Sequence, residues 1–301
     1  MLMLGSLIGL LFMGLAVDTT SLTRSVDEDD GDDDGEPGGG TDGGGSTNPG
    51  VTTDGTEGDD WLAGKDGDDL LTGFGGNDDL HGGLGGDTLL GGAGTDWIYG
   101  DGDYGQGGND SIDGGDGADS LAGQGGNDTV LGGNGDDTIF GGEGDDLLSG
   151  GNGTDWISGN SGNDTLIAGR GEDDLDAGEG NDVLYGSAEE DRAWLHGDEG
   201  DDTLFGGAND FVEGGAGADR FVLDDPGTGS VPTIGDYNGA EDRIELRYED
   251  DGSGTQPVLS LDHDTEGAAV IRMDGVAVGR LMNAQALDLR DIVLTPVQPA
   301  A

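Results

Sequence analysis

The sequence lacks cysteine altogether, and only ten of its 301 residues are lysine or arginine. The absence of cysteine excludes disulfide bonds and thiolate metal sites. Against the few basic residues stand 66 aspartates and glutamates, which give a formal net charge of -56. Because so acidic a chain repels nucleic acids and anionic membrane surfaces, neither is expected as a partner. The same charge makes the chain repel itself unless counter-ions are bound.

Recognisable catalytic motifs are also absent from the sequence. The three histidines, His81, His196 and His263, lie outside any H-E-x-x-H frame, so the motif of a zinc protease is missing. No G-x-S-x-G sequence occurs, which argues against a lipase. Stretches that fit G-x-G-x-x-G lack the strand and helix of a phosphate-binding loop, so we interpret their glycines as turn residues. The sequence predicts a protein that is not an enzyme, with His81 and His196 as ordinary surface residues.

What the sequence has in abundance is one nine-residue unit, G-G-x-G-x-D-x-U-x, in which U is a large apolar residue. The unit recurs from Gly58 to Phe221, and most of its steps are nine residues long. A large apolar residue follows two places after each sixth-position aspartate. These aspartates are Asp60, Asp69, Asp78, Asp87, Asp96, Asp110, Asp119, Asp128, Asp137, Asp146, Asp155, Asp164, Asp173, Asp182, Asp202, Asp210 and Asp219.

A fixed short period over this length is typical of a solenoid, whose repeats are stable only when they are stacked. The glycines of G-G-x-G-x-D favour a turn, because glycine accepts positive φ angles. The remaining x-U-x is long enough for one short strand, in which U faces inward and its neighbours face solvent. Two units then complete one coil, so residues i and i+18 lie above one another. The sequence therefore predicts an all-β fold.

Stacked coils bring aspartates together, for example Asp119 beside Asp137, at the ~4.7–4.9 Å spacing of paired strands. Like charges at that distance repel one another, and calcium, which takes about six to eight oxygen ligands, reverses the effect. Carbonyl groups of the turns are expected to supply the remaining oxygens. The U residues form one thin apolar column, too small to offset the entropy of ordering a glycine-rich chain. Metal binding must therefore contribute to the free energy of folding.

The unit resembles the calcium-binding nonapeptide of the RTX (repeats-in-toxin, or hemolysin-type) family over residues 58–221. The resemblance implies a right-handed parallel β-roll that is disordered without calcium and reaches the extracellular space through type I secretion machinery. We expect a monomer with ten regular calcium sites, each between aspartates 18 residues apart. The resemblance places the calcium ligands at Asp60, Asp69, Asp78, Asp87, Asp96, Asp110, Asp119, Asp128, Asp137, Asp146, Asp155, Asp164, Asp173, Asp182, Asp202 and Asp219.

The repeats are interrupted at three places. Five extra residues near 101–105 are expected to bulge from one turn. Further on, Ala193 occupies an aspartate position, so we expect that coil to lose a regular site, with Asp191 as the residue that compensates. Asp210 follows G-G-A-N without the fourth glycine, so its turn is one residue short and it is left out of the ligand set.

Three tryptophans, Trp61, Trp97 and Trp156, stand between the aspartate and U, so their side chains are expected to face outward. Exposed aromatic residues can mark a surface for sugars or for a partner. Single exposed aromatic residues are nevertheless common in proteins. We interpret these three as ordinary surface residues, and the sequence predicts no carbohydrate site.

The two ends of the chain differ from the repeats. Residues 1–17 are apolar, and three interpretations stay open: an export signal, a membrane-associated N-terminus, or a segment without a targeting role. Residues 18–57 are rich in aspartate and glycine and are predicted to be a disordered linker. Residues 222–301 alternate apolar and polar residues and are predicted to form a β-rich cap. Segments such as GADRFVL and LRDIVL are similar to the serralysin C-terminal domain, which implies a secretion signal near this end.

Together these features predict a secreted calcium-binding protein whose roll folds when calcium binds outside the cell. Two other classes stay open. One is a calcium-dependent adhesin or structural protein of the cell surface. The other is a non-catalytic module related to a secreted RTX enzyme such as a protease, lipase or epimerase.

Overall fold

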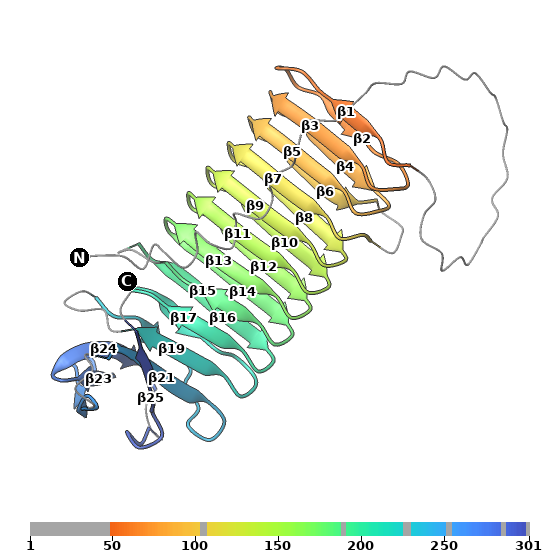
Figure 1. Cartoon of the computed structure of the whole chain (residues 1–301). Coiled ribbons are helices and arrows are strands. Elements are labelled where there is room, and N and C mark those ends of the chain that lie inside the picture. Colours follow the sequence, from red (N-terminus) through yellow and green to blue (C-terminus); the bar gives the residue numbers. More distant parts are fainter. Residues whose placement is uncertain are drawn as a thin grey trace, which may run out of the picture. The chain divides into compact units, whose positions relative to one another are not determined.

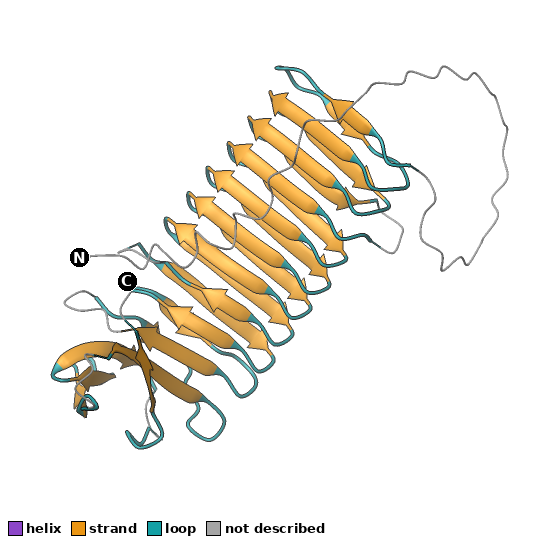
Figure 2. Ribbon diagram, in the orientation of Figure 1, coloured by secondary structure: helices purple, strands orange, loops and turns teal. Residues whose placement is uncertain are grey.

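Short β-strands follow one another along the chain in a computed structural model that describes residues 49–102, 107–187, 191–224, 230–250, 255–283 and 287–298. Within these ranges the strands form two sheets and no helix is present, which confirms the predicted all-β class. None of the described segments is therefore a membrane-spanning helix. Successive strands alternate between the sheets along the solenoid (Figure 1, Figure 2). The apolar segment 1–17 and most of the predicted linker lie outside the described residues.

Sheet A contains the odd-numbered strands except β23. In pairing order they are β1 (Thr52–Asp54), β3 (Leu70–Gly75), β5 (Thr88–Ala93), β7 (Ser111–Asp116), β9 (Thr129–Asn134), β11 (Leu147–Asn152), β13 (Thr165–Arg170), β15 (Val183–Tyr185), β17 (Thr203–Gly206), β19 (Arg220–Asp224), β21 (Arg243–Glu249) and β25 (Val293–Val297). Sheet B contains the even-numbered strands and β23. In pairing order they are β2 (Trp61–Ala63), β4 (Asp79–Gly83), β6 (Trp97–Asp101), β8 (Ser120–Gly125), β10 (Thr138–Glu143), β12 (Trp156–Ser161), β14 (Asp173–Glu179), β16 (Ala193–Glu199), β18 (Phe211–Glu213), β20 (Thr233–Ile234), β24 (Val276–Leu281), β23 (Ala269–Met273) and β22 (Leu259–His263).

The strand register confirms that two units make one coil. Ile139 of β10 pairs in parallel with Ile157 of β12, which is the U residue two units later. The register is also kept where the chain carries extra residues. Leu89 of β5 pairs with Ile112 of β7 across the insertion near 101–105. The stacking of the strands is therefore unchanged across the insertion, most of whose residues lie outside the described ranges.

The apolar side chains at the U positions form the core between the two sheets. Each U side chain is buried, with no more than 8% of its surface exposed. Burying a side chain of this size stabilises a fold by roughly 1.5–3 kcal/mol. The U residues are Leu62, Leu71, Leu80, Leu89, Ile98, Ile112, Leu121, Val130, Ile139, Leu148, Ile157, Leu166, Leu175, Leu184, Leu204, Val212 and Phe221.

Two constraints on the backbone favour glycine in the turns. Gly142 and Gly144 have φ angles of 128° and 127°, which side chains make unfavourable. A Cβ atom on Gly142 would also lie 1.9 Å from the carbonyl oxygen of Gln124 in the preceding coil. The coils therefore approach one another this closely because these positions have no side chain.

The solenoid begins before the boundary predicted from the sequence. Strand β1 pairs with β3 although its residues, 52–54, fall in the segment assigned to the linker. Val51 and Thr53 take the aspartate and U positions of this first coil, so the repeat pattern does not reveal it. The prediction of a disordered linker through residue 57 is therefore wrong for residues 52–54.

The solenoid also continues past Phe221. Strands β21 and β25 extend sheet A, and β20 and β24 extend sheet B, all by parallel pairing. Ile234, Ile244 and Leu281 are buried and continue the core. The predicted β-rich character of residues 222–301 is thus present, but most of its strands prolong the two sheets instead of forming a separate cap.

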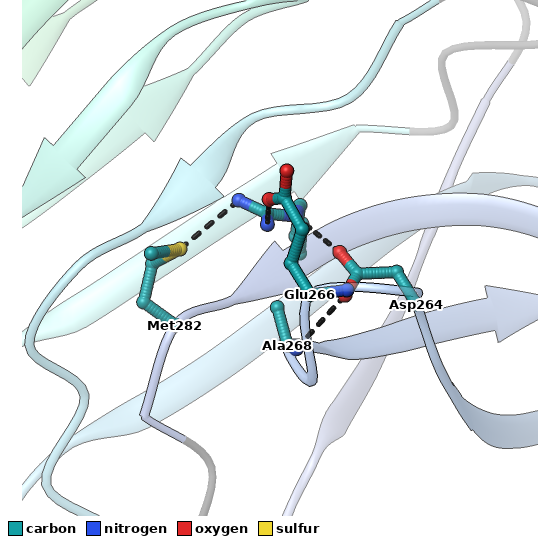
Figure 3. A network of polar contacts seen from close by, with 5 residues as sticks. Asp264, Glu266, Ala268 and Met282 are labelled. Carbon is teal, nitrogen blue, oxygen red and sulfur yellow. Dashed lines mark hydrogen bonds and ion pairs between the residues drawn. The ribbon is translucent and has the colours of Figure 1, made fainter.

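An antiparallel extension ends sheet B, where β22 pairs with β23 and β23 with β24. Arg280 of β24 fixes the turn between β22 and β23 (Figure 3). Its Nε donates to Asp264 Oδ2 at 2.7 Å, and its Nη2 donates to Glu266 Oε2 at 2.6 Å. The backbone N–H of Ala268 donates to Asp264 Oδ1 at 2.9 Å. A solenoid needs such an end structure because its last coil would otherwise expose core and strand edges.

Candidate metal sites in the turns

The turns of the roll form two rows. Turns that lead from sheet A to sheet B form the first row, and turns that lead back to sheet A form the second. The first row contains Asp60, Asp78, Asp96, Asp119, Asp137, Asp155, Asp173 and Asp210. The second row contains Asp69, Asp87, Asp110, Asp128, Asp146, Asp164, Asp182, Asp202, Asp219 and Asp242.

Within each row, hydrogen bonds join the aspartates of successive coils. The backbone N–H of one aspartate donates to Oδ1 of the aspartate in the next coil, as from Asp119 to Asp137 at 2.9 Å. Fifteen such bonds occur among the described residues, at 2.7–3.2 Å. The expected pairing 18 residues apart is therefore present. The ladder also crosses the insertions, as from Asp87 to Asp110, 23 residues on.

The second carboxylate oxygen of most of these aspartates has no partner. Fourteen of the sixteen predicted ligands have a buried Oδ2 without any hydrogen bond. A buried polar atom left in this state costs about 1–3 kcal/mol, and more when it is charged. These aspartates are Asp78, Asp87, Asp96, Asp110, Asp119, Asp128, Asp137, Asp146, Asp155, Asp164, Asp173, Asp182, Asp202 and Asp219.

Burial raises the pKa of these carboxyl groups. The pKa of Asp110 is raised to about 8, and the pKa values of Asp137 and Asp146 are raised to about 7, with desolvation as the largest cause. The N–H donor on each carboxylate lowers the pKa, and neighbouring carboxylates raise it again. Asp101 and Asp128 act on Asp110 in this way. The rows therefore carry negative charge in places that disfavour it.

A backbone carbonyl approaches most of the unpartnered Oδ2 atoms beside the first glycine of the unit. A Cβ atom added to Gly141 would lie 2.3 Å from Asp146 Oδ2 and 2.8 Å from the carbonyl oxygen of Gly159 in the next coil. The pairing of β10 with β12 passes from Phe140 to Gly142 and omits Gly141. The missing side chain thus leaves a cradle in which carboxylate and carbonyl oxygens converge.

The oxygens in these cradles match a hard cation. Among the described residues, no three histidine, cysteine, aspartate or glutamate side chains gather as one metal-binding group. The donor set consists instead of individual carboxylates with backbone carbonyls, which suits calcium, whereas zinc prefers histidine and cysteine. The residues present therefore fit calcium, with Oδ2 as the side-chain ligand atom.

Three aspartates of the repeat differ from this pattern because local donors reach Oδ2. The backbone N–H and Oγ1 of Thr56 donate to Asp60 Oδ2 at 2.6 and 2.8 Å. The N–H of Lys65 donates to Asp69 Oδ2 at 2.6 Å. Asp210, which the sequence excluded, accepts from the N–H of Gly207 at 2.6 Å. Asp60 and Asp69 were predicted as ligands, and their Oδ2 atoms are already occupied by these bonds.

Two aspartates outside the predicted set join the second row. Asp242 Oδ1 accepts from the N–H of Asp219 at 3.2 Å and thus extends the ladder beyond the repeats. Its signal in the sequence was the triplet Asp242-Arg243-Ile244, which repeats the D-x-U pattern. Asp101 is buried near Asp110 and accepts from Gly125 N–H at 3.1 Å. It stands beside the insertion and outside the nine-residue unit, so the repeat pattern did not mark it as a ligand.

The coil with alanine in the aspartate position keeps its ladder bond. The N–H of Ala193 donates to Asp210 Oδ1 at 2.8 Å. Asp191 Oδ2 accepts from the N–H of Gly171 at 3.2 Å. The pKa of Asp173 is raised to about 6, mainly by burial and in part by the charge of Asp191. Asp191 therefore lies close to the turn in which it was expected to compensate.

A parallel β-solenoid with rows of buried carboxylate and carbonyl oxygens in its turns defines the class of calcium-binding β-rolls. The family model of the RTX calcium-binding nonapeptide repeat matches residues 54–89, 81–103, 104–139, 122–157, 131–166, 158–193 and 190–221. Because these matches span more than half of the sequence, the chain belongs to the RTX family of calcium-binding repeat proteins.

Two solved structures are similar to parts of the chain. One is the solution structure of the AlgE6R3 subunit from the Azotobacter vinelandii mannuronan C5-epimerase, with 23% identity over 53% of this chain and 78% of that chain, and a TM-score of 0.26. The other is the crystal structure of the extracellular lipase LipA from Serratia marcescens, with 18% identity over 81% of this chain and 40% of that chain, and a TM-score of 0.22. A search of curated proteins finds no match to the sequence.

Proposed function

We propose that the chain is a secreted protein whose β-roll folds when calcium binds to it outside the cell. The observation that carries the proposal is the set of fourteen buried Oδ2 atoms without a hydrogen-bond partner. Each unsatisfied oxygen costs about 1–3 kcal/mol. Repulsion between neighbouring carboxylates adds to that cost along each row. Bound calcium supplies the positive charge and the coordination that these oxygens lack.

The two oxygens of each carboxylate have separate tasks in this proposal. Oδ1 accepts a backbone N–H and keeps successive coils in register, as Asp137 does for Asp119. Oδ2 stays free to bind the ion beside the carbonyl of the next coil. Folding and calcium binding therefore depend on the same side chains, because the cradle exists only when the coils are stacked.

The apolar core is too narrow to replace this contribution. Each coil buries little more than its U side chains between the two sheets, while the turns order many glycines, whose backbone entropy is high. In a cytosol low in calcium we expect the chain to stay unfolded. Outside the cell, at the ~10⁻⁴–10⁻³ M affinity of extracellular calcium modules, it binds calcium and folds.

Export and the lack of catalysis belong to the same proposal. An unfolded acidic chain is suited to type I secretion machinery, and the similarity of residues 222–301 to the serralysin C-terminal domain supports a signal near that end. The sequence contains neither H-E-x-x-H nor G-x-S-x-G, which supports a non-catalytic role. Recovery of the protein from the medium is expected. Its retention on washed cells would favour a surface adhesin instead.

A calcium titration of the full chain tests the coupling of binding and folding. Far-UV circular dichroism is expected to show a cooperative change from coil to β structure, and calorimetry several calcium ions per chain. Magnesium serves as the control, because its smaller octahedral shell fits carbonyl-lined cradles poorly. A chain that is fully folded in chelator at neutral pH would contradict the proposal.

A further inference from the structure

All four tryptophans of the chain lie on one face of the roll. Trp61, Trp97, Trp156 and Trp194 belong to β2, β6, β12 and β16 of sheet B. Each stands one residue before a buried apolar side chain of the core, so it projects from the outer face. Exposure reaches 68% for Trp61, 57% for Trp97 and 41% for Trp156. Large exposed aromatic residues gathered on one surface are typical of a binding face.

The strand register arranges the tryptophans in two identical triplets. Trp61 pairs with Asp79, and Asp79 pairs with Trp97. Further along the sheet, Trp156 pairs with Asp174, and Asp174 pairs with Trp194. Within each triplet the tryptophans are therefore two strand spacings apart, ~9.6 Å. Both triplets place a carboxylate between two indole rings.

Both triplets contribute residues to a hollow on this face, although Trp61 lies outside the first one. The first hollow, of about 340 Å³, is lined by Asp79, His81, Trp97, Tyr99, Asp101 and Gln124. The second, of about 670 Å³, is lined by Trp156, Trp194, His196, Thr138 and Thr154 and by the carboxylates of Asp136, Asp137, Asp155, Glu172 and Asp174. The first hollow therefore has one indole ring and the second has two, and each combines them with an imidazole and with carboxylates.

A histidine faces the carboxylate in both triplets. His81 Nε2 lies 2.8 Å from Asp79 Oδ1. His196 Nε2 lies 3.7 Å from Asp174 Oδ1, and its Nδ1 lies 3.3 Å from Glu213 Oε2. Asp79 is therefore hydrogen-bonded to His81, whereas the 3.7 Å separation leaves Asp174 without a hydrogen bond to His196.

The first triplet also continues into a larger aromatic surface. The rings of His81 and Tyr99 are stacked, with centroids 5.0 Å apart and planes inclined by 20°. The centroids of Trp61 and His81 are 6.3 Å apart. Trp61, His81 and Tyr99 thus form one continuous patch that crosses three strands of sheet B.

We propose that this face binds a linear chain of neutral, β-linked pyranose sugars. The C–H face of a pyranose packs against an indole ring, and its hydroxyl groups bond to carboxylate and imidazole. In an extended β-linked chain, alternate sugars present the same face at nearly twice the strand spacing, which matches the tryptophan separation within each triplet. The carboxylates of the triplets and the acidic surface exclude uronic acid polymers by repulsion.

A cationic polymer is the competing ligand, because indole rings also attract cations. Arg192 already places its guanidinium 5.5 Å from the ring centroid of Trp194. In the first triplet, however, Asp79 already bonds to His81, so a cation there would have to displace that partner. The arrangement therefore favours a neutral glycan. This function goes beyond calcium binding and requires only that the roll is folded.

Intrinsic fluorescence tests the inference directly, since every tryptophan of the chain lies on this face. The full chain, folded in calcium, is titrated with cellohexaose, with chitohexaose, with an oligouronate and with poly-L-lysine. A neutral hexasaccharide is expected to shift the emission to shorter wavelength, and the oligouronate is expected to have no effect. If neither neutral hexasaccharide changes the emission, or if only poly-L-lysine binds, the inference is wrong.

Variants identify the binding face. Trp97→Ala combined with Trp156→Ala removes one tryptophan from each triplet and is expected to weaken hexasaccharide binding at least tenfold by calorimetry. Tyr185→Ala, which removes an aromatic residue from the outer face of sheet A, is the matched control and is expected to bind normally. Trp97→Phe keeps a ring and is expected to retain most of the affinity. Circular dichroism in calcium checks the fold of each variant, so loss of glycan binding can be distinguished from failure of calcium-dependent folding.

Discussion

The backbone N–H of Asp119 donates to Asp137 Oδ1 at 2.9 Å, while Asp137 Oδ2 is buried without a partner. Oδ1 of this carboxylate therefore has a hydrogen-bond partner in the neighbouring coil, whereas Oδ2 has no partner in the protein. Because the same relationship recurs in both rows of turns, it separates the residues' structural contribution from their metal-binding contribution. Substitutions can test the two parts independently.

Asp137→Asn keeps an oxygen that can accept the N–H of Asp119 but replaces the ligand oxygen with an amide nitrogen. We expect the calcium-loaded roll to lose about 2–3 kcal/mol for each ion lost when calcium exceeds its dissociation constant ~100-fold. In chelator the variant should have at least as much β structure as the natural chain, because a buried charge is gone. Urea unfolding in calcium and circular dichroism in chelator measure the two effects. Asp136→Asn, at the exposed neighbouring position, is the control.

Alanine at the first position of the unit tests the cradle. Gly141→Ala would place a Cβ 2.3 Å from Asp146 Oδ2, so calcium affinity at that turn should fall. Ala168 naturally fills the equivalent position before Asp173 and is fully buried. Ala168→Gly should therefore strengthen calcium binding, although glycine costs the fold about 0.5–1 kcal/mol. Calorimetry measures the calcium affinity of both variants. Gly102→Ala is the control, because its added Cβ would have no atom within 4 Å. If Gly141→Ala strengthened calcium binding and Ala168→Gly weakened it, the cradle would not be the place that holds the ion.

The pH dependence of the calcium-free chain should be opposite to that of calcium binding. The folded pKa values of Asp155, Asp137 and Asp110 are raised to about 6, 7 and 8, above their values in the unfolded chain. The stability from these groups is complete below the unfolded pKa near 4 and is lost as pH rises through the folded values. In chelator, β structure should therefore be greater at pH 5 than at pH 8. Circular dichroism in chelator checks this, and more structure at pH 8 would contradict it.

Calcium affinity should instead rise over the same pH range, because protons compete with the metal for Oδ2. Calorimetric titrations at pH 5, 6.5 and 8, at constant ionic strength, measure this trend. Affinity that is unchanged between pH 5 and 8 would show that buried carboxylates do not supply the ligand oxygens.

The apolar column makes its own contribution to stability. Ile139 is fully buried, and Ile139→Ala should destabilise the calcium-loaded roll by about 2–5 kcal/mol. Thr138→Ala, on the outer face of the same strand, should change stability by less than about 0.5 kcal/mol. Urea unfolding in saturating calcium measures both. Similar losses from both variants would mean that the column does not act as the core.

Regular parts of the roll were predictable from local pattern, and irregular parts were not. The U residues, the turns and the stacking of Asp119 on Asp137 all follow from the nine-residue period. The first coil was not predicted, because Val51 and Thr53 stand in place of the aspartate and the large apolar residue of the unit. The continuation of the two sheets past Phe221 was not predicted, because long connections separate strands that pair, such as β21 and β25.

The face that carries the tryptophans shows the same limit. The sequence indicated that Trp61, Trp97 and Trp156 point outward, but it did not show that Trp194 shares their sheet. The first triplet follows the 18-residue spacing that the repeat predicts, whereas two extra residues before Trp194 shift it out of that count. Only the strand register shows that Trp194 pairs with Asp174.

The sequence by itself determined the repeat, the inward and outward side chains and the aspartates of the turns, because each follows from a pattern that recurs within a few residues. Tertiary structure decided which oxygen of each carboxylate is bonded, how insertions are absorbed and which aromatic side chains become neighbours. Those properties depend on contacts between coils, where backbone hydrogen bonds set the register regardless of the number of residues in the intervening loop.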